Sequence, residues 1–485
     1  MISSMSLILY ALLASSAPAA TEARDWGAAL RMDATALHDD VAANHPGPVN
    51  PTDPGFEARN DAQLALALRR AKTAKSYADY FYAMRHYVTS FNDGHVSFGV
   101  FGATPEDYRW PGFLTRYDSD GKERVFSRAD WGPVPVGAEL VGCDGKPANE
   151  VSAEVVGSIM GRWKLLSQRL TWGNIIFTNE TDPYVTHPAR CTFDVRGAKR
   201  TVALDWRPID RSDMFSRLAS SRPPPPPPVE MHGLADGTRW LTLPSFDGNP
   251  ASDAGKGLTA ILKTLDDEGD AVRAAPAIVL DLRGNTGGSS DWSYQIAKRL
   301  WGEGALEALP PDKITVTWRA SPANLNTIRA SYEKRLKTGE MADEQRQWFE
   351  QVIGGLQGAI AAHRATWKQG PDSSPAGPNA KLPRYKLRGP VYFVTDAACA
   401  SACLDAVDLW RSLGAIHVGQ ETSADTLYLE VRSDDLPSKL GRIGIPMKVY
   451  SGRKRGSNQP VVPQHVFKGD INDTAALQAW IKSLR

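Results

Sequence analysis

The chain has 485 residues, of which 42% are hydrophobic and 23% are charged, and its formal net charge is +1. These values are typical of a globular protein long enough for about three domains. A charge so close to neutral provides no broad electrostatic field for nucleic acid or for an anionic membrane surface, so we expect neither as a partner.

A short apolar run, residues 6–14 (SLILYALLA), stands near the start of the chain and precedes the small residues Ala17-Pro18-Ala19. This arrangement predicts a secretory signal peptide over residues 1–20, although no Lys or Arg precedes the run. The alternative is a membrane anchor, but the run is much shorter than the ~20 residues of a membrane-spanning helix. We therefore expect an exported protein, periplasmic or extracellular, without an integral membrane span.

Two domains are predicted before the middle of the chain. Residues 21–95 form a helical domain, because apolar residues recur at helical spacing until an Asn-Asp-Gly turn. Residues 96–210 alternate short apolar segments with turns, which predicts a β-rich domain. Residues 211–237 contain an unbroken proline run at 223–228, so we expect a stiff, extended linker there.

From residue 238 to residue 485 the pattern changes to alternating strands and helices, which predicts an α/β core. Residues 277–282 (AIVLDL) form a continuous apolar strand, as in a sheet that is buried on both faces. Residues 303–388 interrupt the pattern with an insertion that contains an amphipathic helix, and an insertion of this length is a candidate lid. The predicted fold class is α/β, within a multidomain α+β chain.

Two strand-to-helix turns of the predicted core are rich in small residues. The first, 281–288 (DLRGNTGG), has glycines that let the backbone approach a substrate, and its amides suit a developing oxyanion. The second, 399–403 (CASAC), places Ser401 at the start of a helix. Because ligands of α/β sheets bind at the carboxyl ends of strands, the two turns together would pair a nucleophile with backbone donors. The alternatives are a plain structural turn and a serine that caps its helix.

A serine nucleophile needs a general base. His95 has the best context among the histidines, because it follows a helix and an Asp-Gly turn and so lies on a loop. His45, just before Pro46, is the next candidate. A histidine with a purely structural role is the alternative reading of His95.

The cysteines are Cys143, Cys191, Cys399 and Cys403. Export would place them in an oxidising compartment, where disulfides persist. Cys143 and Cys191 fall in one predicted β-rich region, and Cys399 and Cys403 would share one face of a helix, so each pair can form a bridge. The alternative is that they are small buried hydrophobic residues. Their spacing does not suit zinc, and we expect no metal and no cofactor.

Several short motifs follow one another along the chain in a characteristic order, and with them the chain resembles the tail-specific and tricorn-core family of serine peptidases, the C-terminal processing peptidases. The motifs are DGHV (93–96), VGAELVGCDGKP (136–147), LPSF (243–246), DLRGNTGG (281–288), CASAC (399–403), GQETSAD (419–425) and a final P-x-x-P (460–463). The resemblance implies a PDZ-like β-rich module and a ClpP- and crotonase-like core with a helical insertion.

The family has two catalytic designs. One pairs the serine with a lysine further along the chain, but Asp425 stands at the corresponding position here. The resemblance therefore implies the other design, in which Ser401 is the nucleophile and His95 is the base. The backbone amides of Gly287, Gly288 and Ala402 would then form the oxyanion hole.

That design also uses a glutamate, just before the final P-x-x-P, to orient the histidine. This chain has no carboxylate at that place, 456–459 (GSNQ). Ser457 or Asn458 could hold the imidazole through a neutral hydrogen bond. Asp93, Glu421 or Asp425 could supply a carboxylate from elsewhere.

The function implied by the resemblance is that of an exported serine peptidase, which hydrolyses a peptide or protein substrate through an acyl-enzyme on Ser401. In the family, PDZ-like modules take up extended peptides by strand addition. Two alternatives remain open. The first is a non-catalytic protein that binds peptides or apolar ligands on the same fold, and the second is an esterase or amidase that acts on small molecules.

Overall fold

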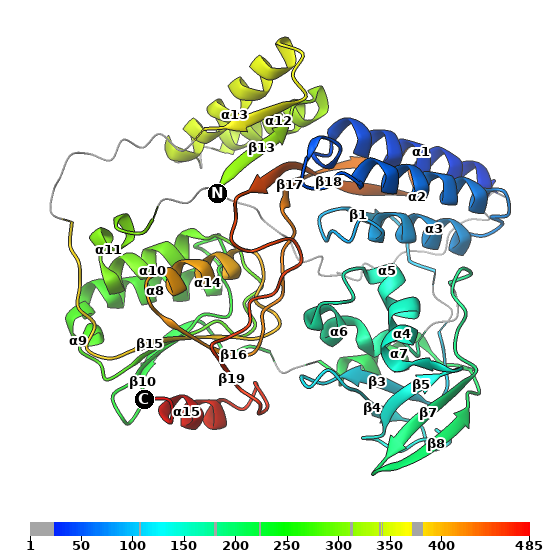
Figure 1. Ribbon diagram of the computed structural model, residues 1–485, viewed down its shortest axis with the longest axis horizontal. Helices are drawn as coiled ribbons and strands as arrows, with labels where there is room; N and C mark the ends of the chain where they lie inside the picture. The colour runs from blue at the N-terminus through cyan, green and yellow to red at the C-terminus, as the bar shows by residue number, and fades with distance from the viewer. Residues whose placement is uncertain are drawn as a thin grey trace.

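The computed structural model describes residues 24–105, 108–178, 182–222, 225–310, 314–338, 341, 343–370 and 382–485. The signal peptide predicted over residues 1–20 lies outside these residues. The described chain is a mixed α/β, multidomain protein, as the sequence predicted, and it forms three bodies (Figure 1). Among the residues described, we find no helix with both the length and the apolar composition that crossing a bilayer requires.

The first body, which we call the core, is built on a six-stranded sheet in the order β10-β11-β12-β15-β16-β19. Five of its strands, β11, β12, β15, β16 and β19, run parallel to one another. The sixth, β10, pairs antiparallel with β11 at one edge. The strands are β10 (Glu230–Gly233), β11 (Arg239–Thr242), β12 (Ile278–Asp281), β15 (Val391–Thr395), β16 (Ile416–Gly419) and β19 (His465–Val466). The parallel order brings the carboxyl ends of β12 and β15 side by side, which places the two glycine- and serine-bearing turns together.

Helices cover both faces of this sheet, so its central strands are apolar on both sides. Leu280 and Phe393 pack with α8, α10 and α14 on one face, whereas Val279 and Tyr392 pack with α15 on the other. This alternation follows from the two-residue period of a strand. The core helices are α8 (Asp253–Asp267), α9 (Gly269–Arg273), α10 (Asp291–Trp301), α11 (Glu303–Glu307), α14 (Ala402–Ser412) and α15 (Thr474–Lys482).

The second body, which we call the helical body, joins the N-terminal helices to strands from the C-terminal half of the chain (Figure 1). Its helices are α1 (Trp26–Asn44), α2 (Phe56–Ala71) and α3 (Tyr77–Thr89). They pack on a sheet of β1 (Ser97–Val100), β17 (Tyr428–Asp435), β18 (Gly441–Ser451), β13 (Thr315–Arg319) and β14 (Thr366–Gln369). We predicted an α/β core over 238–485 that is interrupted by the insertion 303–388. The structure places β17 and β18 in the helical body, because their apolar faces cover α1 and α3.

The predicted insertion, 303–388, contributes to the same sheet. Strand β13 pairs antiparallel with both β14 and β18. Two helices, α12 (Pro322–Thr338) and α13 (Asp343–Ala361), complete this part. The side chain of Arg319 donates to the carbonyl of Ala43, and that of Asn324 to the carbonyl of Asn44, so the insertion caps the end of α1.

The third body, the β-rich module, comprises the described residues between 108 and 222. Its strands are β2 (Arg109–Trp110), β3 (Phe113–Tyr117), β4 (Glu123–Arg128), β5 (Glu139–Cys143), β6 (Lys146–Pro147), β7 (Arg190–Val195), β8 (Ala198–Ala203) and β9 (Arg207–Pro208). Its helices are α4 (Ala148–Ser152), α5 (Ser158–Met160), α6 (Leu166–Trp172) and α7 (Arg211–Ala219). A disulfide joins Cys143 of β5 to Cys191 of β7.

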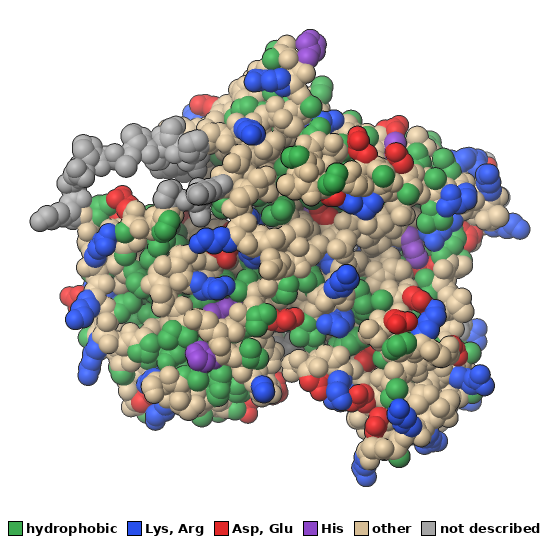
Figure 2. Space-filling view, viewed as in Figure 1, with side chains coloured by type: hydrophobic (Ala, Val, Ile, Leu, Met, Phe, Trp, Pro, Cys, Tyr) green, Lys and Arg blue, Asp and Glu red, His purple; other side chains and the backbone are tan. Residues whose placement is uncertain are grey.

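The segment that we expected to be a linker, 211–237, is partly ordered as helix and strand. Helix α7 buries Met214 in the β-rich module, and β10 belongs to the core sheet. Between them, the described prolines 225–228 are exposed and run past the core, where a side chain on Gly284 would lie 3.1 Å from Cβ of Pro226. Figure 2 shows one face of the molecule, over which basic and acidic side chains are interspersed. This face is indented between the core and the β-rich module.

Candidate active site

Ser401 lies in the turn between β15 and α14, with an unusual backbone conformation. Its φ is 56° and its ψ is −125°. A non-glycine residue held in so sparsely populated a region costs about 1–3 kcal/mol. The alternative that Ser401 merely caps α14 is wrong, because its hydroxyl makes no capping hydrogen bond. The strain is therefore not explained by a structural role of the hydroxyl.

A disulfide between Cys399 and Cys403 closes the turn around Ser401. Both cysteines are completely buried. The backbone N–H of Ser401 donates to Oδ1 of Asp425, at 3.1 Å. A covalent bridge and a carboxylate thus hold the strained residue in place from two sides.

The glycine-rich turn after β12 lies directly against Ser401. A Cβ on Gly287 would approach Cβ of Ser401 to 2.7 Å, and one on Gly288 would overlap the carbonyl oxygen of Phe246 at 2.0 Å. Both glycines have positive φ, 104° and 132°. Only glycine allows this approach, as the sequence suggested.

The predicted oxyanion donors are not equivalent. The N–H of Gly287 donates to Oδ1 of Asn285 at 2.8 Å, so this amide is not available to an oxyanion and its assignment is corrected. The amides of Gly288 and Ala402, by contrast, have no acceptor within the described part of the chain. Ala402 is the first residue of α14, where the helix dipole adds a partial positive charge. These two amides remain as candidate donors.

His95 is held on the loop that follows α3. Its backbone N–H donates to Oδ1 of Asp93 at 2.8 Å, and its side chain is 15% exposed. Its Nδ1 lies 3.2 Å from Oγ1 of Thr426 and 3.5 Å from Oδ1 of Asp93. Thr426 donates its hydroxyl proton to the same Asp93 oxygen at 2.8 Å. The hydroxyl proton of Thr426 is thereby used, so its oxygen accepts from Nδ1–H of His95.

These bonds fix the tautomer of His95. With the proton on Nδ1, the Nε2 atom carries the lone pair that a general base needs. Thr426 is a relay between imidazole and carboxylate. Asp93 was one of several carboxylates considered from the sequence, but nothing in the sequence pointed to Thr426.

The pKa shifts of His95 and Asp93 fit a general base that is supported by an ionised carboxylate. Burial lowers the pKa of His95, but its interactions with Asp93 outweigh burial and the net pKa is raised. Burial likewise raises the pKa of Asp93, yet its bonds with His95 bring the net pKa below the ordinary range. Asp425 also raises the pKa of His95, whereas Arg162 lowers it.

Asp425 and Thr426 are consecutive residues, and together they connect the two halves of the site. Asp425 binds the amide of Ser401, and Thr426 binds the imidazole of His95. The β-rich module supports this segment, because Arg162 donates to the carbonyl of Ala424 at 2.9 Å. One short segment therefore contacts both Ser401 and His95, which lie far apart in the sequence.

The two residues that we expected to orient His95 do not contact its imidazole. Asn458 donates its side-chain amide to the carbonyl of Asn92 at 2.7 Å, and its N–H to the carbonyl of Asp425 at 2.8 Å. Ser457 is exposed. Asn458 instead links the loop of His95 to the segment of Asp425 and stabilises their relative position.

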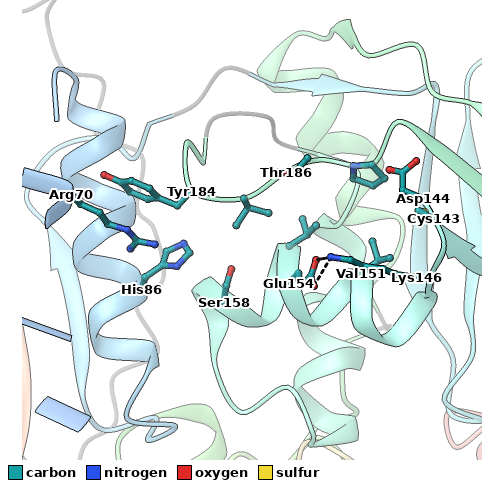
Figure 3. Close-up of a pocket in the computed structure, with 13 residues that line it drawn as sticks. Arg70, His86, Cys143, Asp144, Lys146, Val151, Glu154, Ser158, Tyr184 and Thr186 are labelled. Atoms are coloured by element: carbon teal, nitrogen blue, oxygen red, sulfur yellow. Dashed lines mark hydrogen bonds and ion pairs between the residues drawn. The ribbon is translucent and has the colours of Figure 1, made fainter. Parts of the chain in front are cut away.

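A pocket of about 430 Å³ lies elsewhere, between α3 and the β-rich module (Figure 3). Arg70, His86 and Tyr184 face Ser158 and the Lys146–Glu154 ion pair across it. Neither Ser401 nor His95 lines this pocket, so it is separate from the candidate site. Within the described ranges, no group of three or more His, Cys, Asp or Glu residues is arranged to hold a metal ion.

Comparisons with known proteins identify a family match and a shared fold. Residues 239–439 match the model of Peptidase family S41. No curated protein matches the chain. The structure of mature CPAF complexed with lactacystin is 14% identical, with a TM-score of 0.57 and coverage of 95% of this chain and 98% of that chain. The crystal structure of mature CPAF is also 14% identical, with a TM-score of 0.58 and coverage of 95% of this chain and 96% of that chain. At this identity the likeness shows a shared fold. The part of the chain that carries Ser401, residues 239–439, matches Peptidase family S41, and the chain is a serine-type peptidase.

Proposed function

We propose that this chain is an exported peptidase that cleaves peptide bonds through an acyl-enzyme on Ser401, with His95 as the general base. One observation supports the pairing above all others: Ser401 and His95 bind the consecutive residues Asp425 and Thr426. The strained backbone of Ser401 and the raised pKa of His95 support it independently.

In the proposed reaction, Nε2 of His95 takes the hydroxyl proton as Ser401 attacks the substrate carbonyl. The oxyanion that forms accepts hydrogen bonds from the amides of Gly288 and Ala402. Asp93 stabilises the imidazolium through Thr426, and His95 then gives the proton to the leaving amine. Water then attacks the acyl-enzyme. His95 takes the proton of the water and afterwards returns it to the oxygen of Ser401, which leaves as the free hydroxyl.

The carboxylate of Asp93 bears directly on the binding-protein alternative. That reading rested on the missing glutamate near the final P-x-x-P. Asp93 offers His95 an ionised acid from the same loop, which supports a Ser-His mechanism in the absence of that glutamate.

The central test is labelling with a fluorophosphonate probe, which reacts with activated serines. We expect the wild type to be labelled and Ser401→Ala to be unlabelled. Ser412→Ala, at the far end of α14, is a matched control and should react like the wild type. His95→Gln should react more slowly by roughly 10³-fold or more, as expected when the general base is removed. A wild type that never reacts would favour the binding protein.

The substrate class needs a second measurement. Values of kcat/KM for peptides and for simple esters separate a peptidase from a small-molecule esterase. We expect peptides to be cleaved, with both activities lost together in Ser401→Ala. Hydrolysis of esters with no cleavage of any peptide in a mixed library would overturn the peptidase assignment.

Export is supported by the predicted leader and by the two disulfides, which persist in oxidising compartments. We expect the chain expressed with its own leader to be recovered outside the cytoplasm, with residues 1–20 removed. The intact mass of the recovered protein measures this. A full-length mass in the cytoplasmic fraction would contradict it.

A further inference from the structure

A second histidine, His45, lies behind the candidate site. It follows α1 directly and is completely buried. Its ring stacks on Phe56 at 4.5 Å and meets the edge of Tyr428 at 4.6 Å. The sequence ranked His45 second among the histidines, and the proposed mechanism does not use it.

The hydrogen bonds of His45 determine where its proton is. The backbone N–H of Gly47 donates to Nδ1 at 2.8 Å, so Nδ1 carries the lone pair. Burial lowers the pKa of His45 to about 4, so the ring is neutral near pH 7. The remaining proton is therefore on Nε2. This buried donor has no partner in the described part of the chain.

Asp93 presents the complementary feature. Its Oδ1 accepts from the backbone of His95 and from Thr426, but its buried Oδ2 has no partner among the described residues. The two groups also interact electrostatically: Asp93 raises the pKa of His45, and His45 lowers the pKa of Asp93. Buried polar atoms without partners are rare, so a neighbouring donor and acceptor that both lack one deserve a joint explanation.

We propose that His45 is a positioning residue of the active site, whose Nε2–H supports Oδ2 of Asp93 through one bridging water. The bond holds the carboxylate with its other oxygen on Thr426 and His95. The line of groups then runs from His45 through Asp93, Thr426 and His95 to Ser401. This inference rests on the proposed role of His95 as base.

Other charged groups surround this line and enter any pH dependence. Asp53 and Arg59 act on His45 from the region of α2. Arg162 of the β-rich module and Asp425 act on His95. Arg162 also acts electrostatically on Asp93. No described residue hydrogen-bonds Oδ2 of Asp93 directly, and among these groups only His45 has a buried donor without a partner in the described part of the chain, so its removal isolates the effect.

Two substitutions separate the donor from the packing of the ring. His45→Phe keeps an aromatic ring against Phe56 but has no donor. His45→Gln places an amide N–H near the position of Nε2. Both variants lose the acceptor for Gly47, and they differ in the Nε2 donor and in the ring that packs on Phe56. Loss of the ring can only harm His45→Gln, so a higher kcat in His45→Gln than in His45→Phe is attributable to the donor. The full chain is used, and thermal unfolding of both variants measures the shared cost in stability.

We expect kcat of His45→Phe to fall about 10- to 100-fold at unchanged KM, because a hydrogen bond to a charged group is lost from the reaction but not from the substrate site. His45→Gln should recover most of this loss. A His45→Phe variant with the kcat of the wild type, or a His45→Gln variant impaired as much as His45→Phe, would overturn the inference. Labelling of the wild type but not of Ser401→Ala shows in the same experiment whether the proposed function itself holds.

A spectroscopic measurement tests the contact even in an inactive protein. Hydrogen bonds to a carboxylate favour its charged form, so losing one raises the pKa. The ¹³C resonance of the Asp93 carboxyl should titrate roughly one pH unit higher in His45→Phe than in His45→Gln. Equal titration curves in the two variants would show that His45 does not serve Asp93, whatever the enzyme does.

Discussion

Replacing Thr426 with valine removes the hydroxyl that connects His95 to Asp93 and preserves the shape of the side chain. The hydroxyl accepts from Nδ1 of His95 at 3.2 Å and donates to Oδ1 of Asp93 at 2.8 Å. Hydrogen bonds to charged groups contribute about 1.5–3 kcal/mol. Since 1.36 kcal/mol corresponds to tenfold in rate, we expect kcat to fall roughly 10- to 150-fold with KM unchanged.

The structure also sets an upper limit to this loss. Nδ1 of His95 lies only 3.5 Å from Oδ1 of Asp93, so the carboxylate still supports the imidazole directly in Thr426→Val. The loss should therefore stay well below the roughly 10⁴-fold effect of removing an orienting carboxylate. Asp93→Asn is expected to reach that larger value, which places the two variants in a defined order.

The rate of reaction with a fluorophosphonate probe measures the effect without a known substrate, and peptide kinetics then give kcat and KM. Thr115→Val is the matched control, because Thr115 is buried and donates to a carboxyl oxygen of Glu123 in the β-rich module. It should lower the unfolding temperature and leave the labelling rate unchanged. If Thr426→Val reacts within threefold of the wild type, or if both variants lose activity equally, the relay through Thr426 is refuted.

Three further predictions concern pH, stability and the glycine turn. Because His95 must be neutral to act as a base and its pKa is raised, kcat/KM should rise with pH through a pKa above 6.5; a midpoint below that value would contradict the environment described. Burial raises the pKa of Glu123 from 4.5 to about 8, so its stabilising contribution is complete below pH 4.5 and lost as pH rises through about 8. Chemical unfolding should show a fall of roughly 1.4 kcal/mol per pH unit across this range, absent in Glu123→Gln. Gly287→Ala should lose labelling by about 100-fold or more, because its Cβ would meet Ser401 at 2.7 Å; Gly121→Ala, with positive φ but open space, should change stability alone.

Much of the core could be predicted from the sequence, because its local patterns agree with its tertiary structure. The apolar run at 277–282 became β12 (Ile278–Asp281), and the CASAC turn precedes α14 (Ala402–Ser412). The strand is covered by helices on both faces, so its continuous apolar composition is typical of a parallel sheet. The neighbouring positions of the two turns followed from the same reasoning.

The parts that could not be predicted depend on contacts between distant segments. Nothing local in β17 or β18 shows that they pack on α1 and α3 rather than on the core. Thr426 is an ordinary threonine until the fold places it beside His95, 331 residues away in sequence. The use of the Gly287 amide by Asn285 is a matter of side-chain direction, which spacing does not encode.

The pairing of β1 with β18 has a consequence for how the protein is made. His95 lies two residues before β1, whose Ser97 is in register with Gly444 of β18, so part of what holds the loop of His95 is synthesised after Ser401. Asp425 and Thr426, which bind Ser401 and His95, also come late. A growing chain on the ribosome therefore contains His95 early and Ser401 later, but the two are held together only after Asp425, Thr426 and β18 have also emerged. Chains that stop before β18 should therefore lack the assembled site.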